Sequence, residues 1–153
     1  MKVTQRNYIE EDYDNYIKVL IKENMEQLFI DNFGGWSDEV CKKKFFNIVK
    51  QGFVELFFFD NVFAGYVSFN IEKNNTTSFL INDIHLKKEF QQKGIGSQIL
   101  EFVIKKAKEN KISQLKVFVF KNNPSIEFYK KQGFIEVETL LKSDTSIMIK
   151  TLN

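Results

Sequence analysis

Two side chains near the middle of the chain, Asp83 and His85, could exchange protons with a bound molecule. They belong to the β-rich run Ser78–Leu86. Because side chains alternate along a strand, positions 83 and 85 are predicted to share one face. Imidazole exchanges protons readily near neutral pH, whereas a carboxylate would need a raised pKa to act as a base. Either residue is a candidate general base. A histidine in a strand can also be a packed or capped side chain.

The segment that follows this run, Gln91-Gln92-Lys93-Gly94-Ile95-Gly96-Ser97, is typical of an anion-binding turn. Glycines let the backbone approach a ligand, and the amides of the next helical turn point outward with the positive end of the helix dipole. A pyrophosphate would fit such a turn. The pattern lacks the third glycine of a dinucleotide-binding turn and the Gly-Lys-Ser/Thr of a P-loop.

Lysines surround the turn at positions 87, 88 and 93. They would attract a polyanion over a distance, although a loop lysine is by itself more often only solvated.

The predicted elements place these residues in an α+β fold with a central β-α-β unit. Helical spacing of apolar residues predicts a helix over Glu11–Asn24, a second helix from an N-cap at Ser37 to about Gly52, and a third from Gly94 to Asn110. Asn123-Pro124 predicts the start of a short helix that ends near Gly133. The predicted strands are Met1–Thr4, Val54–Phe59, Val62–Ile71, Ser78–Leu86, Leu115–Phe120, Phe134–Val137 and Ser146–Lys150, with a tight turn at Asp60-Asn61.

Composition narrows the functional classes. The 153 residues suit one domain, which we expect to span 1–153, and the net charge of +2 with a single arginine, Arg6, does not indicate a nucleic-acid partner. No apolar run approaches the roughly 18 residues that a membrane helix needs. The N-terminal segment lacks the apolar stretch of a signal peptide, and the lone Cys41 cannot form an internal disulfide. A cytoplasmic protein without a membrane partner is therefore expected.

Two motifs together carry a family resemblance. Gln91-x-x-Gly94-x-Gly96 resembles the Gln/Arg-x-x-Gly-x-Gly/Ala motif of the GNAT N-acetyltransferases. About thirty residues later, Asn122-x-x-Ser125-x-x-Phe128-Tyr129 with Gly133-Phe134 resembles that family's Asn-x-x-Ala-x-x-Phe-Tyr…Gly-Phe segment. The resemblance implies a GNAT-like fold, with a mostly antiparallel mixed sheet of about six or seven strands and about four helices. It also implies acetyl-CoA as co-substrate, with no metal.

The resemblance further implies roles for single residues. The backbone of the strand at Ile84, His85 and Leu86 would hold the pantetheine arm, and Asn122 would touch it. Amides of the turn would hold the pyrophosphate, and Tyr129 would protonate the departing CoA sulfur. The turn positions concerned are Gln91, Gln92, Lys93, Gly94, Ile95, Gly96 and Ser97.

Acetyl transfer to an amine has two proton-transfer requirements. An alkyl amine with a pKa of about 10.4 must lose a proton before it attacks, and the leaving thiolate must gain one. A phenol with a pKa of about 10 stays protonated at neutral pH and suits the second task, although Tyr129 could instead only pack its helix. Asp83 and His85 remain alternatives for the first task. The ribosomal-protein N-terminal acetyltransferases carry a catalytic glutamate where this chain has Val117, which disfavours that substrate.

The acceptor is expected to be a primary amine on a small molecule or peptide. In this family the first two helices and their loop shape the acceptor pocket, which here gives the segment Asp31–Trp36. Trp36 could form an aromatic wall and Asp31 could attract a cation, while a tryptophan filling the core beneath a turn is the alternative. The oligomeric state could be a monomer or a homodimer. An acyl-CoA-binding sensor without efficient catalysis is an alternative function, and a covalent route through Cys41 a further one.

Overall fold

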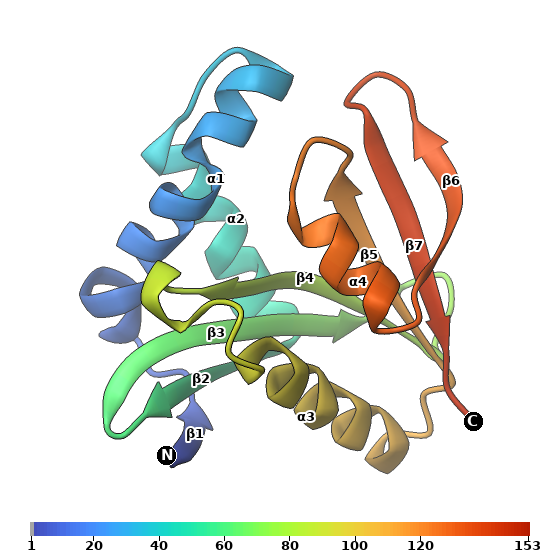
Figure 1. The fold of residues 1–153 in the computed structure, drawn as a ribbon, viewed down its shortest axis with the longest axis horizontal. Coiled ribbons are helices and arrows are strands. Elements are labelled where there is room, and N and C mark those ends of the chain that lie inside the picture. Colours follow the sequence, from blue (N-terminus) through green and yellow to red (C-terminus); the bar gives the residue numbers. More distant parts are fainter. Residues whose placement is uncertain (1) are drawn as a thin grey trace.

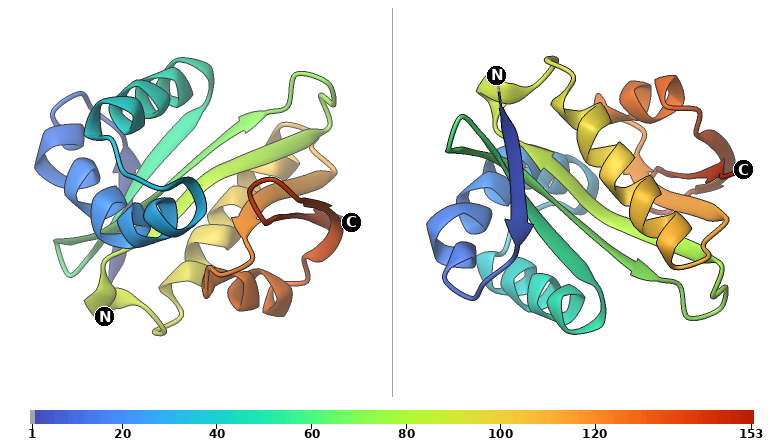
Figure 2. Two further views of the ribbon diagram at one scale, coloured as in Figure 1. Left: turned by 90° about the horizontal axis from the view of Figure 1, so that it is seen from above. Right: turned by 90° about the horizontal axis from the view of Figure 1, so that it is seen from below.

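The protein forms a seven-stranded mixed sheet with helices on both faces, as predicted. The computed structural model describes residues 2–153, and its strands lie in the order β1-β2-β3-β4-β5-β7-β6. Among the strands of residues 2–153, only the β4–β5 pair is parallel. Helices α1 and α2 cover one face of the sheet, while α3 and α4 cover the other (Figures 1 and 2).

The strands follow the predicted order with small shifts at their ends. The Met1 end of the first predicted strand lies outside the described residues. The turn between β2 and β3 is the predicted one, since Asp60 and Asn61 have φ values of 47° and 68°. The strands are β1 Val3–Asn7, β2 Phe53–Phe59, β3 Val62–Ile71, β4 Ser78–Leu86, β5 Gln114–Phe120, β6 Ile135–Leu140 and β7 Thr145–Thr151.

The first helix is longer than predicted. A π-helical turn, Tyr13–Ile17, leads into α1, Lys18–Phe33, so the prediction that the helix ends at Asn24 is wrong. Gly34 ends α1 in the left-handed region at φ 82°, and its N–H donates to Ile30 O. Residues 31–33 therefore belong to the last turn of a helix and not to a loop. Apolar residues recur at helical spacing beyond position 24, at Met25, Leu28, Phe29 and Phe33, so the polar run at positions 22–24 does not end the helix.

The other three helices begin and end near the predicted residues. In α2, Asp38–Gln51, Ser37 is the predicted N-cap and its hydroxyl accepts from Val40 N at 3.2 Å. Helix α3 covers Ile95–Glu109 and α4 covers Ser125–Lys131. Asn123 Oδ1 accepts from Ser125 N at 2.9 Å, as the helix-start pattern predicts.

The parallel pair at the centre of the sheet separates along its length. Strands β4 and β5 pair only from Ser78 with Gln114 to Ile81 with Val117. Beyond Ile81, β4 continues to Leu86 beside β3 alone, so one edge of its last five residues faces no strand. This gap opens on the side where α3 begins (Figure 1).

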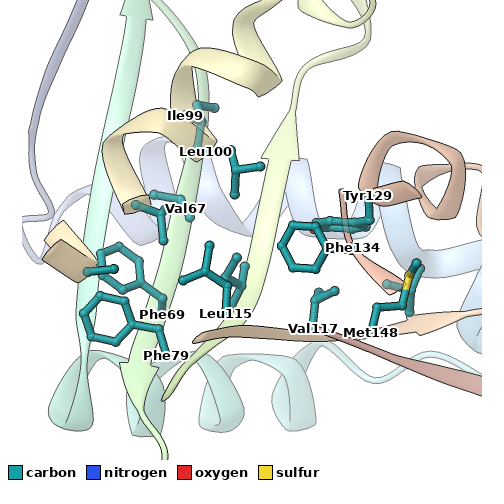
Figure 3. Packing of buried hydrophobic residues seen from close by; sticks show 14 of the residues in the cluster. Val67, Phe69, Phe79, Ile99, Leu100, Leu115, Val117, Tyr129, Phe134 and Met148 are labelled. Carbon is teal, nitrogen blue, oxygen red and sulfur yellow. The ribbon is translucent and has the colours of Figure 1, made fainter. Parts of the chain in front are cut away.

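Two apolar clusters hold the halves of the sheet to their helices. The larger joins α3 and α4 to the sheet, and Figure 3 shows Tyr129 and Phe134 beside Val117 and Met148 in it. The smaller joins the N-terminal turn, α1 and α2 to β2 and β3, with Phe45 and Tyr66 at its centre. Both clusters pack against β3, which makes the strand beside β4 a rigid base for the separated edge. Within residues 2–153, no helix is long and apolar enough to cross a membrane.

Candidate active site

A large cleft lies where β4 separates from β5. Its volume is about 1080 Å³, and it is bounded by the end of β4, the start of α3, the helix α4 and one side of α1. The sequence-predicted residues among its lining are Ile84, His85, Leu86, Gln91, Gln92, Gly94, Gly96, Ser97 and Tyr129. Residues distant in sequence thus line one cleft.

The N-terminus of α3 supplies backbone donors to this cleft. Gly94 caps the helix at φ 81°, and no side chain accepts from its first turn. The first helical bond runs from Gln98 N to Gly94 O at 3.3 Å. The N–H groups of residues 94–97 therefore have no helical partner and can bind an anion.

Gly96 keeps α3 close to α4. A Cβ atom at this position would lie 3.1 Å and 3.3 Å from ring carbons of Phe128 and 3.8 Å from Leu86. On the next residue, Ser97 Oγ accepts from Gln132 Nε2 at 2.9 Å, which ties the first turn of α3 to the end of α4. The anion-binding turn is thus held by contacts from the second sequence motif.

The separated edge of β4 presents backbone polar groups. Lys87 N donates to Ala64 O at 2.8 Å, so Lys87 and alternate residues before it direct their backbone groups toward β3. Ile84 and Leu86 consequently direct theirs toward the gap. Leu86 O already accepts from two side chains, Asn24 Nδ2 at 3.2 Å and Gln91 Nε2 at 3.0 Å.

Asp83 and His85 are brought together, as the alternation predicts. Asp83 Oδ1 lies 3.3 Å from His85 Nε2, and Asp83 Oδ2 accepts from Tyr66 at 3.2 Å and from Ser68 at 3.4 Å. Burial alone would raise the pKa of Asp83, but the interaction with His85 and the charge of Lys44 hold it below its usual range. Asp83 is therefore ionised at neutral pH.

Tyr129 lines the cleft from α4 and is largely buried, with 5% of its surface exposed. Its ring packs against Phe128 and Phe134, and no group within residues 2–153 hydrogen-bonds its hydroxyl. Burial, and secondarily the charge of Asp83, raise the pKa of Tyr129 well above its usual range. The phenol therefore stays protonated and can donate.

Asn122 and the predicted acceptor residues lie elsewhere. Asn122 is exposed and its Oδ1 accepts from Asn32 Nδ2 at 3.1 Å, while its neighbour Asn123 lines the cleft. Trp36 packs on Phe29 and donates to Asp38, and Asp31 accepts from Gln27 within α1. Of the predicted turn residues, Lys93 and Ile95 do not line the cleft, and the Ile95 side chain is in the core.

Sequence reasoning did not identify Asn24, Met25 and Leu28, which line the cleft from α1. With the helix expected to end at Asn24, no pattern pointed to this side of it. The helical spacing of Asn24, Leu28 and Asn32 was a usable signal, because residues four apart share a face.

Charge around the cleft is mixed. Lys88 and Lys131 line it, whereas Lys87 pairs with Glu89 at 3.1 Å. Burial raises the pKa of the Cys41 thiol on α2, which disfavours the reactive thiolate. No group of three histidine, cysteine or acidic side chains that could hold a metal is found in the part of the chain that the structure describes.

Known acetyltransferases share this fold. Residues 22–134 match the sequence profile of the acetyltransferase (GNAT) family. The structure of the PaiA N-acetyltransferase from Thermoplasma acidophilum in complex with coenzyme A superposes with a TM-score of 0.78, at 21% identity and over 99% of each chain. An acetyltransferase from Thermus thermophilus gives a TM-score of 0.73 at 17% identity, over 99% of this chain and 98% of that one.

A larger protein contains the same fold as one part. The N-acetylglutamate synthase from Neisseria gonorrhoeae, solved with coenzyme A and N-acetyl-glutamate, gives a TM-score of 0.75 at 18% identity. The match covers 100% of this chain and 36% of that protein. At such identities the structural likeness concerns the fold.

Proposed function

Since the chain belongs to the GNAT family of acetyltransferases, we propose that it transfers an acetyl group from acetyl-CoA to a primary amine, by direct attack within a ternary complex. The observation that carries this proposal is the single cleft that joins the first turn of α3, without a side-chain cap, to the separated edge of β4. One end of this cleft suits a pyrophosphate and the other an amide-containing arm. We take residues 1–153 as one catalytic domain.

The residues present fit coenzyme A. The pyrophosphate would bind the backbone N–H groups of residues 92–97, with Lys88 and Lys131 near it. The pantetheine arm would pair with the backbone of Ile84 and Leu86, in the position where a neighbouring strand would otherwise lie. Leu86 O already accepts hydrogen bonds from Asn24 and Gln91. The arm would therefore displace one of these donors or pair with the other backbone groups of Ile84 and Leu86. Asn122 would have to turn from Asn32 to reach the arm.

Bound acetyl-CoA would supply an activated thioester. The N–H groups of Ile84 and Leu86, directed into the gap, would stabilise negative charge that develops on the carbonyl oxygen. Tyr129, protonated because burial raises its pKa, would give its proton to the leaving sulfur. These groups line the same cleft from two elements, β4 and α4.

The geometry favours His85 over Asp83 as the base. Asp83 has a lowered pKa and is a weak proton acceptor, but its charge would stabilise the imidazolium that forms when His85 takes a proton. Asp83 would thus orient His85 and balance its charge. The attacking amine loses its proton to His85, and the new N–C bond forms as the C–S bond breaks.

The acceptor is proposed only as an amine on a small molecule or peptide. The test is thiol release from acetyl-CoA with a panel of polyamines, aminoglycosides, amino acids and lysine peptides, beside calorimetric titration of acetyl-CoA alone. Turnover with one class would support the transferase and identify its substrate. Binding without turnover would favour an acyl-CoA sensor, and absence of binding would refute the assignment of the cleft.

A further inference from the structure

We propose that Asn24 is a positioning residue that fixes the neutral ring of His85 in the tautomer with its hydrogen on Nε2, leaving Nδ1 as the atom that accepts a proton. The proposal deepens the assignment of His85 as base and rests on it for its catalytic meaning. The tautomer itself follows from the contacts of α1 with β4. Neither sequence motif includes Asn24.

The orientation of the Asn24 side chain is set by a backbone carbonyl. Its Nδ2 atom lies 3.2 Å from Leu86 O and 3.2 Å from His85 Nδ1. A carbonyl oxygen only accepts, so the side chain must direct its NH₂ group, and not its oxygen, toward Leu86. Turning the amide over would set two oxygens against each other and lose the bond. The second hydrogen of the same NH₂ group then points at His85 Nδ1.

The second hydrogen bond determines where the imidazole carries its hydrogen. An Nδ1 atom that faces a donor must present its lone pair, and a neutral ring then has its hydrogen on Nε2. Nε2 is buried and has no hydrogen-bond partner of good geometry among residues 2–153, but it lies 3.3 Å from the carboxylate of Asp83. An N–H group in that position faces a negative charge. Both ring nitrogens therefore favour the same tautomer.

The surroundings of the ring support this arrangement from every side. From β3, Tyr66 and Ser68 donate to Asp83 and hold it in place. From α2, the charge of Lys44 helps to lower the pKa of Asp83. Together with burial, the charge of Asp83 in turn raises the pKa of Cys41 on α2 and of Tyr129 on α4. Glu23 of α1 also lines the cleft. Among these neighbours, only Asn24 contacts Nδ1.

The arrangement has a consequence for the path of the proton. Nε2 is enclosed, whereas Nδ1 faces Asn24, which lines the cleft. An acceptor amine must therefore deliver its proton to Nδ1 and displace the Asn24 N–H from that lone pair. The N–H bond of the amine breaks, the Nδ1–H bond forms, and the positive charge of the ring faces Asp83. A carboxylate at position 24 would instead hold Nδ1 protonated and remove the base.

The decisive experiment uses the single histidine of the chain. Long-range ¹H–¹⁵N NMR of protein labelled with ¹⁵N-histidine distinguishes protonated from unprotonated ring nitrogens. For the wild type with a neutral ring we expect an unprotonated Nδ1 and a protonated Nε2. Asn24→Ala should give a mixture of tautomers, and Asn24→Asp should move the hydrogen to Nδ1. Gln27→Ala, which removes an exposed amide from the same helix, should match the wild type.

The wild-type spectrum alone can overturn the proposal, because a hydrogen on Nδ1 contradicts it even if a variant fails to fold. Unchanged spectra for both Asn24 variants would overturn it as well. Kinetics separate this result from the proposed function. We expect kcat/KM of Asn24→Asp for the acceptor amine to fall at least about tenfold. If the spectra change as expected while kcat/KM does not, the tautomer stands and His85 is not the base.

Discussion

Asn32 in the last turn of α1 donates its side-chain amide to Asn122 Oδ1 at 3.1 Å, which joins α1 to the turn after β5. Asn24, eight residues earlier on the same side of α1, bonds His85 and Leu86 at the end of β4. At a rise of about 1.5 Å per residue the two asparagines lie about 12 Å apart along the helix. Helix α1 therefore bridges the two strands where they separate, and Leu28 between them lines the cleft.

Mutation of Asn32 and mutation of Asn122, the two partners of the first hydrogen bond, should change the affinity for coenzyme A differently. Asn122→Ala should weaken binding of coenzyme A by roughly 3- to 10-fold, or about 1 kcal/mol, because an amide that can bind the cofactor arm is lost. Asn32→Ala should preserve or strengthen binding, because it releases Asn122. Calorimetric titration checks both. Equal weakening by the two variants would show that the contact itself, and not a released Asn122, supports binding.

Replacement of Gly96 should damage the cofactor site. The added Cβ of Gly96→Ala would lie 3.1 Å from the Phe128 ring, so the ring or the first turn of α3 must shift by a few tenths of an ångström, and a shift of the turn displaces its donors. We expect affinity for coenzyme A to fall about tenfold, which corresponds to about 1.4 kcal/mol. Gly35→Ala is the matched control, because nothing lies within 4 Å of its added Cβ. Unchanged affinity for Gly96→Ala would refute the assignment of this turn.

Tyr129→Phe should lower kcat with little change in KM for acetyl-CoA. The variant keeps the ring packing against Phe128 and Phe134 and removes only the proton donor. Loss of a general acid typically costs 10²- to 10⁴-fold, and we expect roughly 100-fold here. Steady-state kinetics with the identified acceptor provide the measurement, with Tyr16→Phe as control. If kcat stays within about threefold, Tyr129 is not the acid.

Asp83 should make the free energy of unfolding depend on pH in acid. Its pKa in the folded protein lies below that of an unfolded aspartate, about 3.9. Its contribution is therefore present above about pH 4 and is lost as the pH falls through the folded pKa. Urea unfolding from pH 5 to pH 2 should show a smaller loss for Asp83→Asn than for the wild type. Asp14→Asn, a change at an exposed site, should behave like the wild type.

Two buried tyrosines and the half-buried Tyr8 should make the protein less stable in alkali. Burial, followed by the charge of Asp83, raises the pKa of Tyr66 and of Tyr129, and burial raises that of Tyr8 to about 12. Their contribution is complete below the unfolded pKa of about 10 and is lost as the pH rises above it, because only the unfolded chain ionises. Chemical denaturation at increasing pH should show this fall. Tyr66→Phe should show a smaller fall in the free energy of unfolding. If this variant loses as much stability in alkali as the wild type, the raised pKa of Tyr66 is contradicted.

Much of the fold could be predicted because its signals are local. The turn at Asp60-Asn61, the Ser37 cap and the Asn123 start all depend on residues a few positions apart, and β3 and β4 have the predicted ends. The glycine turn was recognised for the same reason, since its free amides follow from chain conformation alone. The boundary predicted at Asn24 is wrong because the polar run at positions 22–24 resembles the end of a helix, although apolar residues recur at helical spacing after it.

The features of the candidate site likewise divide into those that local sequence determines and those that depend on tertiary contacts. By itself, the sequence determined an α+β chain with the two GNAT motifs, one anion-binding turn, and a strand on which Asp83 and His85 share a face. Tertiary structure alone decided that Asn24 contacts His85, that Asn32 holds Asn122, and that Trp36 lies away from the cleft. The contacts of Asn24 and Asn32 join positions 61 and 90 residues apart. Only packing of α1 across the separated strands fixes them, because helical spacing shows which residues share a face of α1 but not which strand that face contacts.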